Sequence, residues 1–337
     1  MMNSNLLILI EKMFKRKFIS FFLVKTNTGD FMRIRLGYAC VSETINVTTS
    51  STYTYSSFLL ENDIDKLDNI INSNLEALDN LIDYNIKNNI HFFRLSSKII
   101  PLATIVDFDY LEKYKSYYEK IGKKIKVNNM RIDFHPDQFT VLNSVKSEVI
   151  DNTFNILKYH YNLLDYLNID KKVLVLHVGS SVFGKEKSIE RFIYHFNKLP
   201  DYLKSSIVIE NDDKIYNIDD CMRINKIINT PVVLDYHHHL CNKSSINFLD
   251  VFSTWKNINP KVHFSSPKIK LKKEFRSHND YINSDDFICF LEQIKNLDFD
   301  IDIMIEAKKK DEALFRLVRE LKYKTNYKFI DETTFFI

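Results

Sequence analysis

The chain has 337 residues, of which 45% are hydrophobic, so it can bury a large core as one large barrel or as two ordinary domains. Its 47 Lys and Arg residues nearly balance 44 Asp and Glu residues, and this formal charge of +3 excludes the globally basic surface of a histone-like DNA binder. Its 4 cysteines lie far apart without CxxC spacing, which favours neither a zinc ribbon nor a disulfide framework and indicates an intracellular protein.

The N-terminal segment mixes apolar and basic side chains, in the stretch LLILIEKMFKRKFISFFLV. It has no uninterrupted apolar run of the roughly 18 residues that a transmembrane helix needs, so no membrane span is expected. Lys15, Arg16 and Lys17 fall inside the apolar stretch, whereas the charges of a signal peptide come before its apolar core. We predict a dispensable extension at 1–31, such as residues upstream of a true start at Met32, with a targeting or surface helix as the alternative.

From Met32 onward, short runs of β-branched and aromatic residues alternate with helical patterns. The helical patterns keep one apolar stripe each, for example at 64–82 and 154–167. Strand-then-helix units that follow one another without a linker predict a single (β/α)8 TIM barrel, which would occupy 32–337. The predicted strands lie at 33–40, 90–96, 130–135, 172–179, 206–211, 231–236, 261–266 and 301–307.

Histidines and acidic residues interrupt these runs where the strands end, on the face where (β/α)8 barrels build their sites. A lone histidine in a strand is more often a satisfied core residue than a ligand, but here six consecutive strands contribute. Buried charges in such number would be left unpaired unless metal ions neutralised them. The candidate ligands are His135, His177, Glu210, Asp235, His238, His263, His278 and Glu306.

These donors exceed what a single ion needs, which predicts a multinuclear site bridged by Glu210 or Asp235. The mixed nitrogen and oxygen set favours zinc or manganese over copper or iron–sulfur chemistry. Divalent ions roughly 3.5–4 Å apart suit phosphodiester hydrolysis, in which one activates water and another stabilises the leaving oxygen. Clustered ions also suit sugar isomerisation, and the donor set alone does not choose between the two reactions.

A series of motifs covers roughly residues 33–323: LGYA, FFRLSSKIIPLAT, FHPDQFTVLNS, LVLHVG, VIENDDK, VVLDYHHH, KVHFSSPK, RSHNDY and MIEAKKKD. Together they resemble the UV damage endonuclease family, a relative of the apurinic endonuclease IV barrels. The resemblance implies a metal-dependent endonuclease that nicks duplex DNA immediately 5′ of cyclobutane pyrimidine dimers and (6-4) photoproducts and leaves a 3′-hydroxyl. It also implies two to three divalent ions, manganese first and zinc or magnesium as alternatives, held by the eight candidate ligands.

The resemblance further implies catalytic roles for Glu210, Asp235 and Lys261. Lys261 precedes His263 on the same predicted strand and matches a lysine that can be carboxylated near the metals. A plain lysine that faced such a cationic cluster would be repelled, and carbamate formation would remove that conflict.

Three residues match the family's contacts with damaged DNA. Gln138 and Phe139 match a probing pair that enters the duplex opposite a lesion, where a damaged stack costs less to open than an intact one. Tyr38, expected just after the first strand, matches a further lesion contact. The expected partner is therefore damaged double-stranded DNA, bound by a monomer without an obligate protein partner.

Two positions depart from the family pattern. Ile105 stands where a histidine usually follows the PLAT segment, and we expect this change to affect activity rather than metal binding. Val41 and Ser42 stand where an asparagine can occur, which would soften lesion contacts. Two other functions stay open: a xylose isomerase-like sugar isomerase or epimerase, and a damage-binding protein that no longer cuts.

Overall fold

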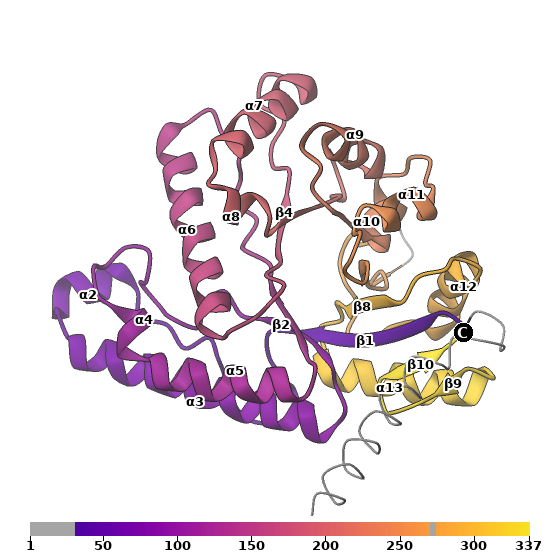
Figure 1. Ribbon diagram of the computed structural model, residues 1–337, viewed down its shortest axis with the longest axis horizontal. Helices are drawn as coiled ribbons and strands as arrows, with labels where there is room; N and C mark the ends of the chain where they lie inside the picture. Colours follow the sequence, from indigo (N-terminus) through magenta and orange to yellow (C-terminus); the bar gives the residue numbers. More distant parts are fainter. Residues whose placement is uncertain (1–30, 270–273) are drawn as a thin grey trace, which may run out of the picture.

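The computed structural model describes residues 31–269 and 274–337, so the predicted extension at 1–31 lies outside the described residues except for Phe31 (Figure 1). Parallel strands close into a barrel in the order β2-β3-β4-β5-β6-β7-β8-β1, and β1 pairs with β2 to complete the ring. The predicted (β/α)8 barrel is therefore confirmed. Its strands are β1 (Arg33–Ala39), β2 (Phe92–Leu95), β3 (Arg131–Phe134), β4 (Leu174–His177), β5 (Ile207–Glu210), β6 (Val232–Asp235), β7 (Lys261–Phe264) and β8 (Ile301–Ile305).

Amphipathic helices surround the barrel and bury the apolar stripes predicted from the sequence (Figure 1). The predicted stripe at 64–82 lies on α3, where Asp63 caps the first turn by accepting a hydrogen bond from the Lys66 amide. Among the described residues, no helix is long and apolar enough to cross a membrane. The helices are α2 (Tyr55–Glu61), α3 (Ile64–Lys87), α4 (Tyr110–Lys113), α5 (Lys115–Val127), α6 (Ser147–Tyr166), α7 (Lys185–Lys198), α8 (Asp201–Lys204), α9 (Ile218–Ile228), α10 (Tyr236–Cys241), α11 (Phe248–Ser253), α12 (Ser284–Ile294) and α13 (Lys310–Lys324).

The C-terminal segment adds two short strands that the sequence patterns did not predict. β10 (Thr334–Phe336) pairs antiparallel with the start of β1, and β9 (Lys328–Phe329) pairs with β10. Asp331 makes the turn between them, because its Oδ1 accepts hydrogen bonds from the backbone amides of Thr333 and Thr334. The end of the chain thus covers the outside of the barrel beside β1.

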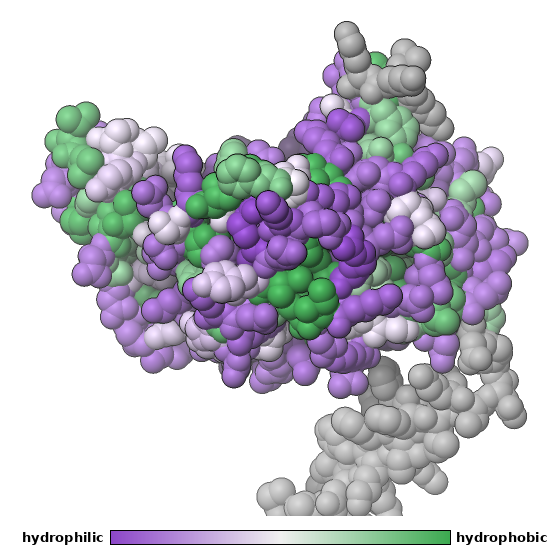
Figure 2. Space-filling model, turned by 90° about the horizontal axis from the view of Figure 1, so that it is seen from above, coloured by the Kyte–Doolittle hydropathy of each residue, from purple (hydrophilic) through white to green (hydrophobic). Residues whose placement is uncertain are grey.

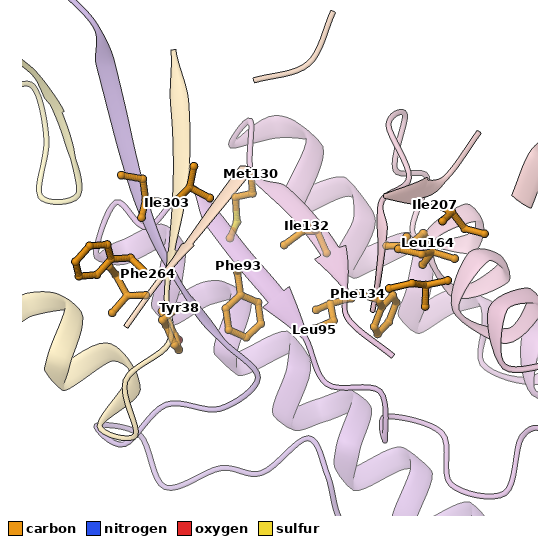
Figure 3. Packing of buried hydrophobic residues seen from close by; sticks show 14 of the residues in the cluster. Tyr38, Phe93, Leu95, Met130, Ile132, Phe134, Leu164, Ile207, Phe264 and Ile303 are labelled. Atoms are coloured by element: carbon orange, nitrogen blue, oxygen red, sulfur yellow. The ribbon is translucent and has the colours of Figure 1, made fainter. Parts of the chain in front are cut away.

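Alternation along each strand divides the buried side chains between two environments. One set faces the helices and forms the main apolar core, in which Tyr38, Phe93 and Phe134 lie on adjacent strands (Figure 3). The other set points into the barrel, where smaller apolar clusters include Val175, Val208, Val233 and Trp255. Polar residues that alternate with these inward positions must therefore find partners inside the barrel.

A buried ionic cluster closes the amino-terminal end of the barrel. Asp302 is fully buried and accepts hydrogen bonds from Arg35, at 2.6 Å from Nε and 2.7 Å from Nη2. Arg131 donates to the same carboxylate at 2.8 Å, and its guanidinium lies over the rings of Phe92 and Trp255. Burial opposes ionisation of Asp302, but the two guanidinium groups outweigh it and hold its pKa below the usual value.

Replacing Asp302 with Asn should lower the free energy of unfolding by about 3–5 kcal/mol at pH 7, because Arg35 and Arg131 would stay buried without a counter-charge. Since the folded pKa of Asp302 is lowered, its contribution is present above the unfolded pKa and is lost as pH falls through the folded pKa. Urea unfolding at neutral and acid pH measures both effects.

Asp300→Asn is the matched control. Asp300 pairs with Arg33 at 2.7 Å in the same two strand regions, but the side chain of Asp300 is 40% exposed and that of Arg33 is 36% exposed. This variant should lose less than about 1 kcal/mol. Equal losses for the two variants would contradict a structural role for the buried cluster.

Candidate metal centre

The predicted ligands lie together at the carboxyl ends of the barrel strands. His177, Glu210 and Asp235 are the last residues of β4, β5 and β6, and His135 and Glu306 directly follow β3 and β8. His263 lies inside β7, His238 lies on α10, and His278 lies in the loop after β7, where it pairs with Pro267 in an isolated bridge. The structure thus brings all eight residues to one rim.

Glu210 is at the centre of this group, with 1% of its surface exposed. Its Oε2 lies 2.8 Å from His135 Nε2 and 3.8 Å from His177 Nε2. Its Oε1 lies 2.8 Å from His263 Nδ1 and 3.6 Å from His238 Nδ1. Burial opposes ionisation, but the surrounding imidazoles, His263 foremost, hold the pKa of Glu210 well below its usual range.

Three groups of side chains each offer ligand atoms within 4.8 Å of one another, and the groups overlap. Glu210, Asp235 and His263 each belong to two groups, and bridging by Glu210 or Asp235 stays a prediction. The groups are His135 with Glu210 and His263, Glu210 with Asp235 and His238, and Asp235 with His263 and Glu306.

Backbone carbonyls orient three of the imidazoles. A carbonyl oxygen can only accept a hydrogen bond, so the Nδ1 atom facing it carries a proton, and Nε2 is the atom that the neutral ring would offer to a metal. Metal-binding histidines are commonly held in this way. The bonds run from His135 to Pro136 (3.0 Å), from His238 to Asn211 (2.9 Å) and from His278 to Glu306 (2.9 Å).

The protein atoms alone leave a conflict that a cation would resolve. Burial lowers the pKa of His135 to about 4 despite the nearby Glu210, so at neutral pH its Nε2 lone pair faces the Glu210 carboxylate at 2.8 Å. Within the described part of the chain, Asp235 Oδ2, His263 Nε2 and His177 Nδ1 are also buried without a hydrogen-bond partner. Such unpartnered ligand atoms around a buried carboxylate fit divalent metal ions.

Arg94 is a member of this site that the sequence patterns did not predict. It points inward from β2, and its Nη1 lies 2.5 Å from Glu306 Oε1. Burial raises the pKa of Glu306, but Arg94 outweighs this effect, and the pKa lies well below its usual range. The available signal was a single arginine inside the apolar run FFRL. Ile105, by contrast, is 56% exposed in the loop after β2 and brings no polar atom to the site.

Lys261 lies one layer deeper than the imidazoles, because it precedes His263 by two residues on β7. The side chain is fully buried, and its Nζ lies 2.8 Å from Asp133 Oδ2, which is also fully buried. Burial lowers the pKa of Lys261 even though Asp133 raises it. The ion pair with Asp133 is an alternative to carboxylation, because it compensates the positive charge that an unmodified lysine would bring near the metal site.

The loop after β3 presents the predicted probing pair. Asp137 folds the loop into a turn, since its Oδ1 accepts from the Phe139 amide at 2.8 Å and its backbone carbonyl accepts from Thr140. Gln138 is exposed, and Phe139 is an aromatic side chain with 76% of its surface exposed. Both side chains therefore project from the rim that carries the candidate ligands.

The structure places Tyr38, the predicted lesion contact after the first strand, in the core rather than at the surface. This residue lies within β1 rather than after it, and Arg35, three positions earlier, points into the barrel, so Tyr38 faces the helices. It is fully buried, its hydroxyl donates to Asn85 Oδ1 at 2.8 Å, and its ring packs against Phe93 (Figure 3). The predicted contact of Tyr38 with a lesion stays a prediction, and it would require this side chain to leave the core.

Comparison with known proteins agrees with this geometry. A profile described as UV-endonuclease UvdE matches residues 34–334. The UV DNA damage endonuclease of Bacillus cereus (strain G9842) is 41% identical over 303 residues, which cover 86% of this chain and 95% of that protein.

Solved structures agree as well. The crystal structure of SacUVDE superposes with a TM-score of 0.78 and 34% sequence identity, over 86% of this chain and 98% of that one. Endonuclease IV from Thermus thermophilus has a TM-score of 0.53 at 12% identity, over 86% and 100% of the two chains, and so shares the fold alone. On these matches, the chain belongs to the UV-endonuclease UvdE family.

Proposed function

We propose that this protein is a UV damage endonuclease, which nicks duplex DNA immediately 5′ of cyclobutane pyrimidine dimers and (6-4) photoproducts and leaves a 3′-hydroxyl. The observation that carries the proposal is the set of overlapping histidine and carboxylate groups around Glu210, on the same rim as the exposed Gln138 and Phe139. The name UV DNA damage endonuclease, carried by relatives about 40% identical, supports it.

Eight residues would hold two to three divalent ions, manganese first and zinc or magnesium as alternatives. When bound, such ions activate water for attack on the phosphodiester and stabilise the leaving oxygen. Glu210 and Asp235, which each belong to more than one overlapping group, would bridge neighbouring ions. The ligands would be His135, His177, Glu210, Asp235, His238, His263, His278 and Glu306.

The chain's own residues prepare this site before DNA binds. Arg94 keeps Glu306 ionised by an ion pair inside the barrel, so the carboxylate stays an acceptor. Backbone carbonyls accept from Nδ1 of His135, His238 and His278, so Nε2 is the ring atom that each would offer to a metal. Little reorganisation would be needed at the moment of reaction, which is how preorganised polar groups lower a barrier.

Gln138 and Phe139 would select the damaged duplex. Their loop is held in a turn by Asp137, so an apolar ring and an amide stand ready on the rim. Such a wedge can fill the gap left when two fused bases leave the stack, and a distorted stack costs less to open than an intact one. Discrimination would thus come from the energy of opening DNA rather than from reading base edges.

Lys261 carboxylation remains a prediction. Only the deprotonated amine reacts with carbon dioxide, and burial of Lys261 lowers its pKa and so favours that form. Asp133 acts in the opposite direction, because its carboxylate at 2.8 Å favours the ammonium form. Carbon NMR of protein prepared with labelled bicarbonate would detect a carbamate.

The direct test uses purified protein, manganese and a duplex that carries one cyclobutane dimer. We expect a single nick 5′ of the dimer that EDTA abolishes and manganese restores. Binding in a gel-shift assay without a nick would favour a non-cutting damage-binding protein. Turnover in a coupled sugar assay, without activity on DNA, would favour an isomerase or epimerase.

Replacing Glu210 with Gln should lower the nicking rate by more than about 100-fold, because the neutral amide cannot bridge cations as the carboxylate does. Bound metal, measured by atomic emission, should fall at the same time. Glu292→Gln, a change on α12 away from the rim, is the control and should keep wild-type nicking. A Glu210→Gln protein that cuts at the wild-type rate would refute the metal assignment.

Replacing both Gln138 and Phe139 with Ala should reduce the preference for damaged over intact duplex while metal content stays constant. The expected loss is roughly 10- to 100-fold, since opening a base step costs on the order of a few kcal/mol. Nicking rates on matched duplexes with and without a dimer measure this preference. An unchanged preference would show that the pair does not probe the lesion.

A further inference from the structure

A second exposed aromatic side chain, Phe183, lies in the loop after β4. It is 73% exposed, so the fold gains little from burying its ring. Its backbone has a φ of 64°, in the left-handed region where the Cβ of an L-residue crowds the carbonyl oxygen. Five other non-glycine residues with positive φ are asparagines, which tolerate this region better: Asn62, Asn89, Asn129, Asn168 and Asn229.

Hydrogen bonds on both sides of Phe183 fix this strained conformation. The carbonyl of Val182 accepts from Ser188 Oγ at 3.0 Å and from Arg191 Nη2 at 2.6 Å. The amide of Gly184 donates to the carbonyl of Ser181 at 2.9 Å. A bulky residue persists in such a conformation only where its surroundings over-determine it, and such residues cluster at functional sites.

The same contacts tie the Phe183 loop to the segment that follows the probing pair. Arg191 Nε donates to the Asn143 carbonyl at 3.0 Å, so one guanidinium holds both loops. Asn143 Nδ2 donates to the Ser180 carbonyl at 2.5 Å. At Gly179 a Cβ would lie 2.4 Å from Asn143 Oδ1, so the two chain segments approach too closely for a side chain there. The loops after β3 and β4 therefore form one unit.

We propose that Phe183 is a second DNA-contacting side chain, which stacks on a base displaced or exposed when Phe139 opens the duplex at a lesion. Phe139 and Phe183 project from loops on adjacent strands of the same rim, and both are largely exposed. Base–aromatic stacking is tolerant of sequence, as a lesion-directed contact has to be. Figure 2 shows one face of the molecule, on which hydrophobic residues lie in small clusters among hydrophilic ones.

The strain supports this role rather than a structural one. The chain uses asparagine at five other left-handed positions, whereas at 183 it keeps an aromatic ring that packs little against the protein. Removing the ring should therefore leave stability unchanged and weaken only the interaction with opened DNA. A ring needed for folding would behave in the opposite way. This inference rests on the proposed function.

The test compares Phe183→Ala and Phe183→Gly with wild-type protein. The probe is a duplex with one cyclobutane dimer and 2-aminopurine in the opposite strand, whose emission rises when the base unstacks. We expect both variants to give a smaller rise in emission and to lose about 5- to 100-fold of the preference for damaged duplex, the range expected for one lost stack. Phe183→Gly should also melt at or above the wild-type temperature, because glycine tolerates positive φ.

Tyr323→Ala is the matched control, since Tyr323 is a 91% exposed aromatic residue near the C-terminal end of α13, away from the rim. It should behave as wild type in every measurement. Wild-type levels of emission and preference in both Phe183 variants would overturn the proposal. Lower melting temperatures in both would also overturn it, by showing a structural role. If the wild-type protein itself does not nick the duplex, the proposed function fails instead.

Discussion

The imidazoles around Glu210 are the constraint on which the arrangement of the rim depends. A carboxylate that is almost fully buried is costly to ionise unless polar groups or cations compensate its charge. His135, His177, His238 and His263 come from four different strands or their loops, so the barrel has to close before the rings can face one carboxylate. A shift of one residue in the register of β7 would turn His263 toward the helices. Correct strand register is thus a precondition of the chemistry.

The charged side chains inside the barrel differ in their partners from the amino-terminal end to the carboxyl end. At the amino-terminal end, Asp302 is fully paired with two arginines, and this cluster only stabilises the fold. One layer higher, Lys261 pairs with Asp133, but Asp133 Oδ1 has no hydrogen-bond partner in the described part of the chain. At the carboxyl end, buried polar atoms that could bind a metal lack hydrogen-bond partners among the residues that the structure describes, for example Asp235 Oδ2 and His263 Nε2. Within the described ranges, unpartnered polar atoms thus occur at each level, from Arg131 Nη2 in the amino-terminal cluster to Asp235 Oδ2 and His263 Nε2 at the rim.

Much of the site can be predicted from the sequence, because a histidine or carboxylate stands out at the end of an apolar strand such as LVLH or IVIE. Arg94 could not be recognised in this way, because its partner Glu306 is 212 residues away and only barrel closure brings them together. The burial of Tyr38 could not be predicted, because its role was assigned by resemblance and its partner Asn85 lies 47 residues away on α3. β9 and β10, of 2 and 3 residues, are too short to leave a periodic pattern.

The positions with positive φ fall into two groups with different prospects for protein engineering. Asparagines hold four of them just before strands, at the amino-terminal end of the barrel: Asn89, Asn129, Asn168 and Asn229. Residues with larger or more reactive side chains hold four others on the rim, three in loops that follow strands and one at the first residue of α13: Cys40, Leu102, Phe183 and Lys310. Glycine at the first group is a route to a more heat-resistant enzyme. The second group is the less promising target for such stabilisation, because strained residues cluster at functional sites.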